Sequence, residues 1–260
     1  MDVLENIGRL EVRTAKSLTD TISFAFQVIF RMFQYRNYNS AMRMVLINQI
    51  YFTSVQILPV FLVVSIVLGS LLIGIVFQLL KQLGLTDYFG NVLMGLIVTE
   101  LSPLFTVLFI TLRSASAINT EMAVMKVTGE MKTLEMFRID VINYLLIPRI
   151  INGIVSLVLL SSLFAIVSMF SGILFSRIIF GISMDGYINI LFNSANLFDL
   201  TIAMVKCVAL GFFITLIPIR FGLRASSEFT SIPISVSGGM VSVFTAIIII
   251  EVLSFLTKLL

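Results

Sequence analysis

The chain has 260 residues, of which 58% are hydrophobic and only 12% are charged, and its mean hydropathy is +1.09. Because an ordinary globular chain has roughly 25% charged residues, this composition predicts an integral membrane protein and leaves no room for a soluble catalytic domain. The absence of His and the single cysteine, Cys207, exclude a Ser/His or Cys/His nucleophile, a His-ligated metal site and an internal disulfide. The net charge of +3 comes without a basic stripe, so no nucleic-acid partner is expected.

Residues 1–43 form a first region, in which charged and apolar positions alternate. The apolar residues recur at spacings of three and four, as on one face of a helix: Leu4, Ile7, Leu10, Leu18 and Ile22. The more apolar stretch 22–33 is too short to cross a bilayer core of about 30 Å. We therefore expect an N-terminal interfacial amphipathic helix, with Arg31, Arg36 and Arg43 facing anionic lipid. The alternative is an amphipathic arm that packs on its own protein.

Residues 44–260 form a second region, with five uncharged or nearly uncharged runs that are each long enough to cross a membrane as a helix. These runs are 44–80, 92–112, 150–176, 200–219 and 229–256. The predicted fold class is therefore an all-α membrane domain of five transmembrane helices. The first run exceeds the roughly 20 residues of a straight span, so we expect a kink or a close helix contact at Pro59, Gly69 or Gly74. The sequence does not define the structure of residues 183–199.

The positive charges at the ends of the spans predict the orientation. With the N-terminus on the inner side, the inner segments carry thirteen Lys and Arg residues, and the outer segments carry three: Lys81, Arg177 and Lys258. Lys and Arg concentrate in the cytoplasmic loops of multi-pass proteins. We therefore expect the N-terminus on the cytoplasmic side and the C-terminus on the opposite side.

The stretch between Arg113 and Arg149 is rich in charge and separates the second run from the third. We expect it to leave the membrane on the cytoplasmic side as a short helix, with an apolar side formed by Met122, Met125, Leu134 and Phe137. Such a helix can dock into a nucleotide-binding partner, because flexible Met side chains fill an irregular groove. A solvated connecting helix is the alternative.

No phosphate-binding loop of the Walker A type occurs in the sequence. The nearest fragment, residues 129–133, reads Gly-Glu-Met-Lys-Thr and lacks the glycine directly before Lys that the motif requires. We therefore expect no cofactor in this chain, and ATP with its Mg²⁺ would be used by a separate subunit.

Several short motifs lie in and around the polar stretch. They are Glu100-Leu101-Ser102-Pro103, Leu112-Arg113-Ser114-Ala115, Thr120-Glu121-Met122-Ala123-Val124-Met125, Glu130-Met131-Lys132-Thr133-Leu134-Glu135 and Pro148-Arg149. In order and spacing they resemble motifs of the MlaE (YrbE) family, the permease subunits of MCE-type ABC transporters that move phospholipids between bacterial membranes. Later positions also resemble the family: Lys206, Gly211-Phe212 and Gly222-Leu223-Arg224.

The chain departs from the family pattern at several positions in and around these motifs. Ser102, Ser114 and Ala123 stand where the family has Gly, so we expect looser or shifted helix contacts there. Thr99 stands where the family often has Arg, so we expect a reduced polar network around Glu100.

The resemblance implies a non-catalytic transport subunit that forms a homodimer in the bacterial inner membrane, with its C-terminus in the periplasm. Its expected partners are membrane lipid, ATP-binding cassette ATPase subunits, an MCE-domain hexamer and, in some systems, a STAS-domain protein. It would move phospholipid between the inner membrane and the MCE partner. The expected ATPase-coupling residues are Glu121, Met125, Glu130, Leu134 and Phe137.

Glu100, Lys206 and Glu251 are the charges well inside the predicted spans. Each charge at a helix centre costs about 2.5–3.5 kcal/mol on insertion scales and usually faces a cavity or a partner. We expect these three residues to line a lipid path together with Leu72 and Val76 of the first span. The alternatives are an ion-pair cluster that holds the helices together and a Glu/Lys relay in an ion-coupled secondary transporter.

The depths of the three charges follow from their positions along the spans. At a rise of 1.5 Å per residue, Glu100 would lie about 9 Å deeper than Lys206. We therefore expect Lys206 to pair with Glu251 near the outer end of the spans, with Glu100 apart from them and facing a lipid headgroup or water.

The predicted orientation can be tested by labelling single cysteines in a Cys207→Ser background. A cysteine at Thr86 should react with a membrane-impermeant thiol reagent from the outside, whereas one at Lys126 should react only after the membrane is permeabilised. Reaction of both positions from the outside would contradict the five-span arrangement.

Overall fold

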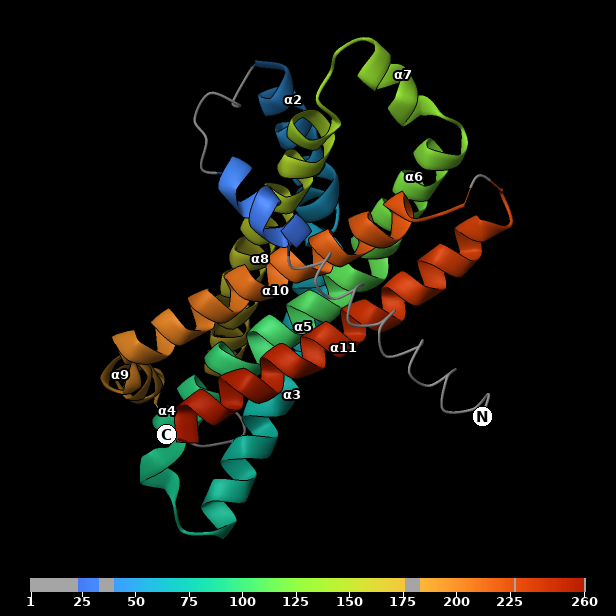
Figure 1. The fold of residues 1–260 in the computed structure, drawn as a ribbon. Helices are drawn as coiled ribbons and strands as arrows, with labels where there is room; N and C mark the ends of the chain where they lie inside the picture. Colours follow the sequence, from blue (N-terminus) through green and yellow to red (C-terminus); the bar gives the residue numbers. More distant parts are fainter. Residues whose placement is uncertain (1–22, 33–39, 176–182, 227, 260) are drawn as a thin grey trace, which may run out of the picture.

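The computed structural model describes residues 23–32, 40–175, 183–226 and 228–259, and this part of the chain is helical without a β-strand. Five helical segments in it are long and apolar enough to cross a membrane, as the sequence predicts (Figure 1). They run over Met42–Gln82, Thr86–Val127, Ile142–Ile173, Leu197–Leu223 and Ser231–Lys258.

The first span is interrupted near its middle. It consists of α2 (Ser40–Ile50), the wide π-helical turn η2 (Tyr51–Val55) and α3 (Leu58–Gln82). Pro59 lies in the first turn of α3, where its missing N–H costs nothing, so the break falls at the predicted proline. Gly69 makes the predicted close helix contact, because a Cβ there would lie 2.5 Å from the Ser168 Cβ. Gly74 has open space around its missing Cβ, so the prediction was wrong for this residue.

The second span is longer than the sequence indicates. Six consecutive elements form one helix of 42 residues: η3 (Thr86–Tyr88), α4 (Phe89–Leu93), η4 (Met94–Leu101), α5 (Ser102–Ile110), η5 (Thr111–Ala115) and α6 (Ser116–Val127). The helix therefore continues past Arg113, where the sequence predicts that the chain leaves the membrane, and ends at Val127. Charged side chains do not end a helix when they can extend into water, and the helix ends instead before Gly129, whose φ of 81° lies in the left-handed region.

The remaining elements surround α10. The third span comprises η6 (Ile142–Leu146) and α8 (Ile147–Phe175), the fourth is α10 (Leu197–Leu223) and the fifth is α11 (Ser231–Leu259). In Figure 1, α10 lies among α8, α5 and α11, and it packs against α8, α11 and α6.

The segment before α10 contains a short helix, α9 (Met184–Ser194). Ser183 caps it by accepting a hydrogen bond from the Gly186 N–H at 3.2 Å. The ring of Tyr187 is fully buried, and burial raises the pKa of Tyr187 to about 12. This aromatic ring fixes α9 against α4 and α8.

The N-terminal helix Ser23–Met32 packs on its own protein. Val28 is fully buried in a cluster with residues of the third and fourth spans, while Phe26 and Phe30 are exposed. Arg31 forms an ion pair with Asp140 at 2.6 Å, so the expectation that Arg31 faces lipid was wrong. Arg43 is exposed, and Arg36 lies outside the described residues.

Helices α8 and α10 approach until their backbones touch. A Cβ at Gly211 would lie 2.7 Å from the Ile154 Cα and 2.8 Å from the Gly153 carbonyl oxygen. The expected looseness where Ser102 and Ala123 replace glycines is absent. Both residues are buried, and Ser102 donates a hydrogen bond to the Ser161 carbonyl.

The close contact predicts the effect of a single methyl group. Gly211→Ala should destabilise the fold by roughly 1–3 kcal/mol, because backbone cannot move aside as a flexible side chain can. The matched control, Gly74→Ala, has open space and should be neutral or stabilising by up to about 1 kcal/mol. The measurement is the temperature at which the buried Cys207 thiol becomes reactive toward a fluorogenic maleimide in detergent. Equal melting temperatures for the two variants would contradict the packing described here.

Candidate functional site

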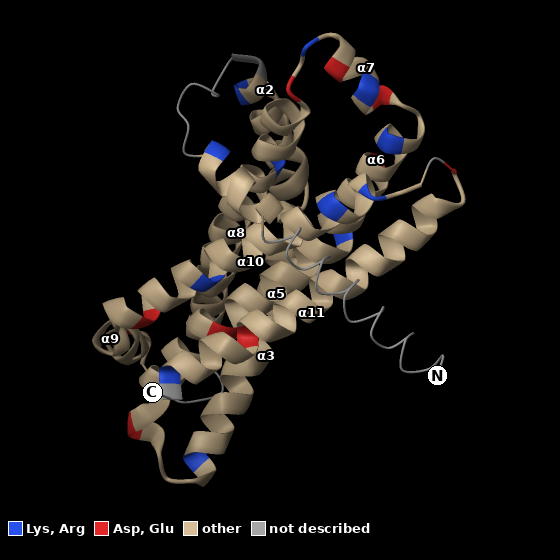
Figure 2. Cartoon of the chain, in the orientation of Figure 1, with Lys and Arg blue, Asp and Glu red and all other residues tan. Residues whose placement is uncertain are grey.

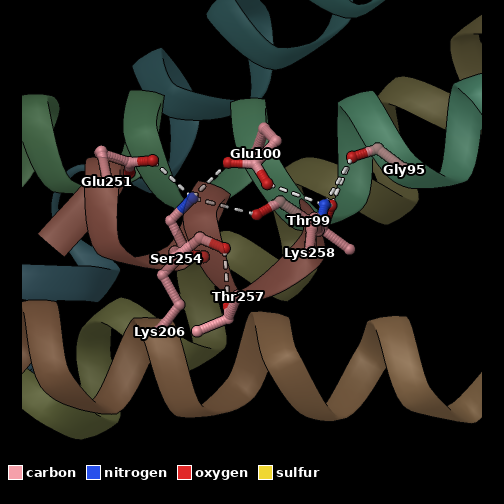
Figure 3. A network of polar contacts seen from close by, with 8 residues as sticks. All are labelled: Gly95, Thr99, Glu100, Lys206, Glu251, Ser254, Thr257 and Lys258. Atoms are coloured by element: carbon pink, nitrogen blue, oxygen red, sulfur yellow. Dashed lines mark hydrogen bonds and ion pairs between the residues drawn. The ribbon is translucent and has the colours of Figure 1, made fainter. Parts of the chain in front are cut away.

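Two lysines and two glutamates from three different spans form a cluster of ion pairs (Figure 3). The Lys206 Nζ on α10 lies 2.6 Å from Glu100 Oε2 on η4 and 2.5 Å from Glu251 Oε2 on α11. The Lys258 Nζ, also on α11, lies 2.7 Å from Glu100 Oε1 and donates to the Thr99 hydroxyl. The four formal charges cancel, so the cluster introduces no net charge among the spans.

The predicted pair of Lys206 and Glu251 is confirmed, but the predicted separation of Glu100 was wrong. Counting residues treats the spans as straight and parallel. Glu100 lies instead in the wide turn η4, and the four-carbon stem of Lys206 spans the remaining distance. Both carboxylates therefore converge on one ammonium group.

Lys258 is the member of the cluster that the sequence reading placed elsewhere, at the outer end of the chain. The spacing of the sequence nevertheless predicts that Lys258 lies near Glu251. Positions seven apart share one helix face, and Lys258 follows Glu251 by seven residues. Lys258 also donates to the Gly95 carbonyl at 3.3 Å. Gly95 and Thr99 lie on successive turns of η4, so Lys258 contacts both turns. A cation thus stands beside Thr99, and the polar network around Glu100 includes two lysines.

The cluster is almost closed to solvent. The side chain of Lys206 is 1% exposed, and those of Glu100 and Glu251 are 20% and 18% exposed. Taking such charges out of water is costly unless each finds a partner. Among the described residues, no three His, Cys, Asp or Glu side chains lie close enough to hold a metal ion. The arrangement is therefore an ion-pair site and offers no metal-ligand set in this part of the chain.

An apolar groove of about 530 Å³ runs between α10 and α11 beside the cluster. Its walls are mainly aliphatic and aromatic, and Lys206, Ser254 and Thr257 add polar groups. The Ser254 hydroxyl and Glu251 Oε1 have no hydrogen-bond partner among the described residues. Figure 2 shows that the cluster stands apart from the charged residues of α6 and α7 at the other end of the molecule. An apolar groove with a few polar groups is suited to an amphiphilic ligand.

The two apolar residues expected on the lipid path lie elsewhere. Val76 is buried in a cluster with α4 and α9, and Leu72 is half-buried on α3. Neither residue lines the groove between α10 and α11.

The residues expected to contact an ATPase are divided between two helices. Glu121 and Met125 belong to α6, whereas Glu130 and Leu134 belong to α7 (Glu130–Met136). Met125 and Leu134 pack on the protein's own core, and Glu121 pairs with Arg149. Phe137 is 74% exposed, and the adjacent Met136, which the sequence reading did not select, is 81% exposed.

Comparison with known proteins gives one family. Residues 46–257 match the family described as Permease MlaE. The chain is 30% identical to a probable ABC transporter permease protein of Synechocystis, over 64% of this chain and 63% of that protein. It is 28% identical to the intermembrane phospholipid transport system permease protein MlaE of Haemophilus influenzae, over 68% of each chain. It is 30% identical to the chloroplastic protein TRIGALACTOSYLDIACYLGLYCEROL 1 of Arabidopsis thaliana, over 71% of this chain and 54% of that longer protein.

The ion-pair geometry predicts an order among charge-removing variants. Lys206→Met leaves Glu251 without a cation, and breaking a buried pair costs about 3–5 kcal/mol. Adding Glu251→Gln should recover much of this loss. Adding Glu100→Gln should recover less, since Glu100 keeps Lys258 as its partner. Melting in detergent, followed by size-exclusion chromatography of heated samples, measures the order. Equal recovery by the two double variants, or effects that simply add, would contradict the predicted pairing.

Proposed function

This chain belongs to the MlaE permease family, and from that premise we propose that it moves phospholipid between the inner membrane and an MCE-protein partner, with ATP hydrolysed by a separate subunit. It is a multi-pass permease of the ABC transporter type. The Haemophilus relative is named for intermembrane phospholipid transport, which supports lipid as the substrate class.

The groove between α10 and α11 is the observation that carries the proposal. Its apolar walls suit acyl chains, and Ser254 and Thr257 add hydroxyl groups for the polar part of a lipid. The Ser254 hydroxyl has no hydrogen-bond partner among the described residues, so it can donate a hydrogen bond to a lipid oxygen. A ligand with both a polar and an apolar part therefore suits this groove.

The fifth span supports a homodimer. In its most apolar window 17% of the residues are buried, against 50% in the second and third spans. Many large apolar side chains of α11 are exposed, including Ile234, Val241, Ile248 and Phe255. A second copy would cover this face and complete the wall of the lipid groove. An MCE-domain hexamer would then receive lipid at the periplasmic end, and a STAS-domain protein would bind from the cytoplasm.

The end of α7 supports contact with an ATP-binding cassette ATPase. Met136 and Phe137 project from the polar segment between the second and third spans and are exposed. A single apolar patch on an otherwise charged excursion is suited to a groove in a soluble partner.

An ion-coupled secondary transporter with a Glu/Lys relay is the second candidate. It would need Glu100 and Glu251 to gain and lose protons, whereas both are paired with lysines in this structure. Such a transporter also has no use for an ATPase. The two functions therefore differ in a partner that can be isolated.

Purification from native membranes tests the proposal. The tagged chain should co-purify with an ATP-binding cassette subunit, and Met136→Asp with Phe137→Asp should abolish the association. A charge placed in an apolar contact costs several kcal/mol when it is desolvated. Leu83→Asp is the matched control, because Leu83 is 69% exposed directly after α3, at the end of the first span that lies away from α7. This variant should retain the ATPase. Absence of an ATPase from the wild-type preparation would favour the secondary transporter.

A further inference from the structure

A polar hollow, separate from the apolar groove, lies toward the α6 and α7 end of the molecule, away from the charge cluster. It has a volume of about 520 Å³ and is enclosed by α2, η2, η5, α6, η6 and the start of α8. Two arginines, Arg113 and Arg149, line it together with Glu121, so its ionic side chains carry one net positive charge. The groove at Lys206 does not include either arginine.

Arg149 is the buried charged residue of this hollow. The residue is 4% exposed, and its Nη2 forms an ion pair with Glu121. Its Nε and Nη1 donate to no described group. Since a guanidinium has five N–H donors, most of the hydrogen-bonding capacity of Arg149 is unused in this part of the chain. A buried donor without an acceptor is costly, so an acceptor from outside the protein would stabilise this arrangement.

The other groups around the hollow suit a ligand with both polar and apolar parts. Arg113 is exposed, and its Nη2 donates to Gln56 Oε1 at 2.8 Å, which holds the guanidinium at the rim. Gln49 Oε1 is buried without a partner among the described residues. Val45 and Phe52 form apolar wall, and Phe52 is 60% exposed on the surface of the first span.

We propose that this hollow binds the phosphate group of a phospholipid from the membrane leaflet at the α6 and α7 end. Planar guanidinium groups match phosphate oxygens with paired hydrogen bonds, which an ammonium group cannot reproduce. Phe52 and Val45 then contact the glycerol and upper acyl region. This proposal requires that the chain lies in a membrane. It holds whether or not the groove at Lys206 binds lipid.

Photo-crosslinking of the full chain tests this site. Phe52 is replaced by p-benzoylphenylalanine, and the protein is held in a maltoside detergent, which carries no phosphate. Tritiated phosphatidylglycerol and tritiated diacylglycerol are supplied separately. Phosphatidylglycerol should label the protein roughly tenfold more strongly, as expected for one charge-assisted hydrogen bond. Equal labelling by the two lipids would show contact with apolar chains alone and would overturn the proposal.

Two variants assign the preference to the arginines. Arg113→Gln should remove the preference for phosphatidylglycerol, and Arg149→Lys should reduce it, because Lys keeps the charge and loses the planar fork. A preference that survives both changes would overturn the proposal. If excess inorganic phosphate removes the phosphatidylglycerol signal, the hollow binds soluble phosphate, and the assignment to lipid is wrong.

A matched probe separates this site from the proposed transport groove. Phe198 lines the groove between α10 and α11 and is 66% exposed. Labelling from p-benzoylphenylalanine at Phe198 should be unchanged by Arg113→Gln, which also shows that the variant is folded. Lipid labelling at Phe52 without labelling at Phe198 would count against the transport groove and leave the arginine site intact.

Discussion

The structure depends on one buried ammonium group. Lys206 lies within an apolar span, and its charge is tolerable there only because carboxylates from two other spans reach it. The second, fourth and fifth spans are thereby fixed at one common level. Lys258 neutralises the second carboxylate oxygen of Glu100, so no charge of the cluster is left without a counter-ion.

Two groups of ionic side chains lie at different levels of the described spans, one at the cluster and one at the hollow lined by Arg113 and Arg149. At the cluster, lysines meet glutamates and the charges cancel. At the other hollow, two guanidinium groups face one carboxylate, and Glu121 forms an ion pair with Arg149. Glu121 stands on α6, and only a two-residue turn separates α6 from α7. In the proposed site, a headgroup that competes for Arg149 would therefore act on the helix that leads to the proposed ATPase contact.

Much of this architecture could be predicted from the sequence, because long uncharged runs in a membrane can only be helices. The five spans and the close contact at Gly69 are examples. The level of Glu100 could not be predicted. A π-helical turn adds a residue without changing the hydropathy of the run, so η4 and η5 leave no pattern in the sequence.

The same limit applies to the polar stretch between the second and third spans. Met125 and Leu134 were selected as partner contacts because they are apolar in a charged segment, but both pack on the protein's own core. Periodicity shows that a helix has an apolar face and does not show what covers it. The exposed pair Met136 and Phe137 became evident only from the folded chain.

The contact of backbone with backbone between Gly153 and Gly211 limits how the permease can move. Where no side chain separates the two backbones, the helices cannot slide past one another without collision, so α8 and α10 are expected to move together. In the proposed transport cycle, movement is then expected at the other boundaries of this pair of helices. The proposed cycle is therefore expected to move the other spans against a fixed block of α8 and α10.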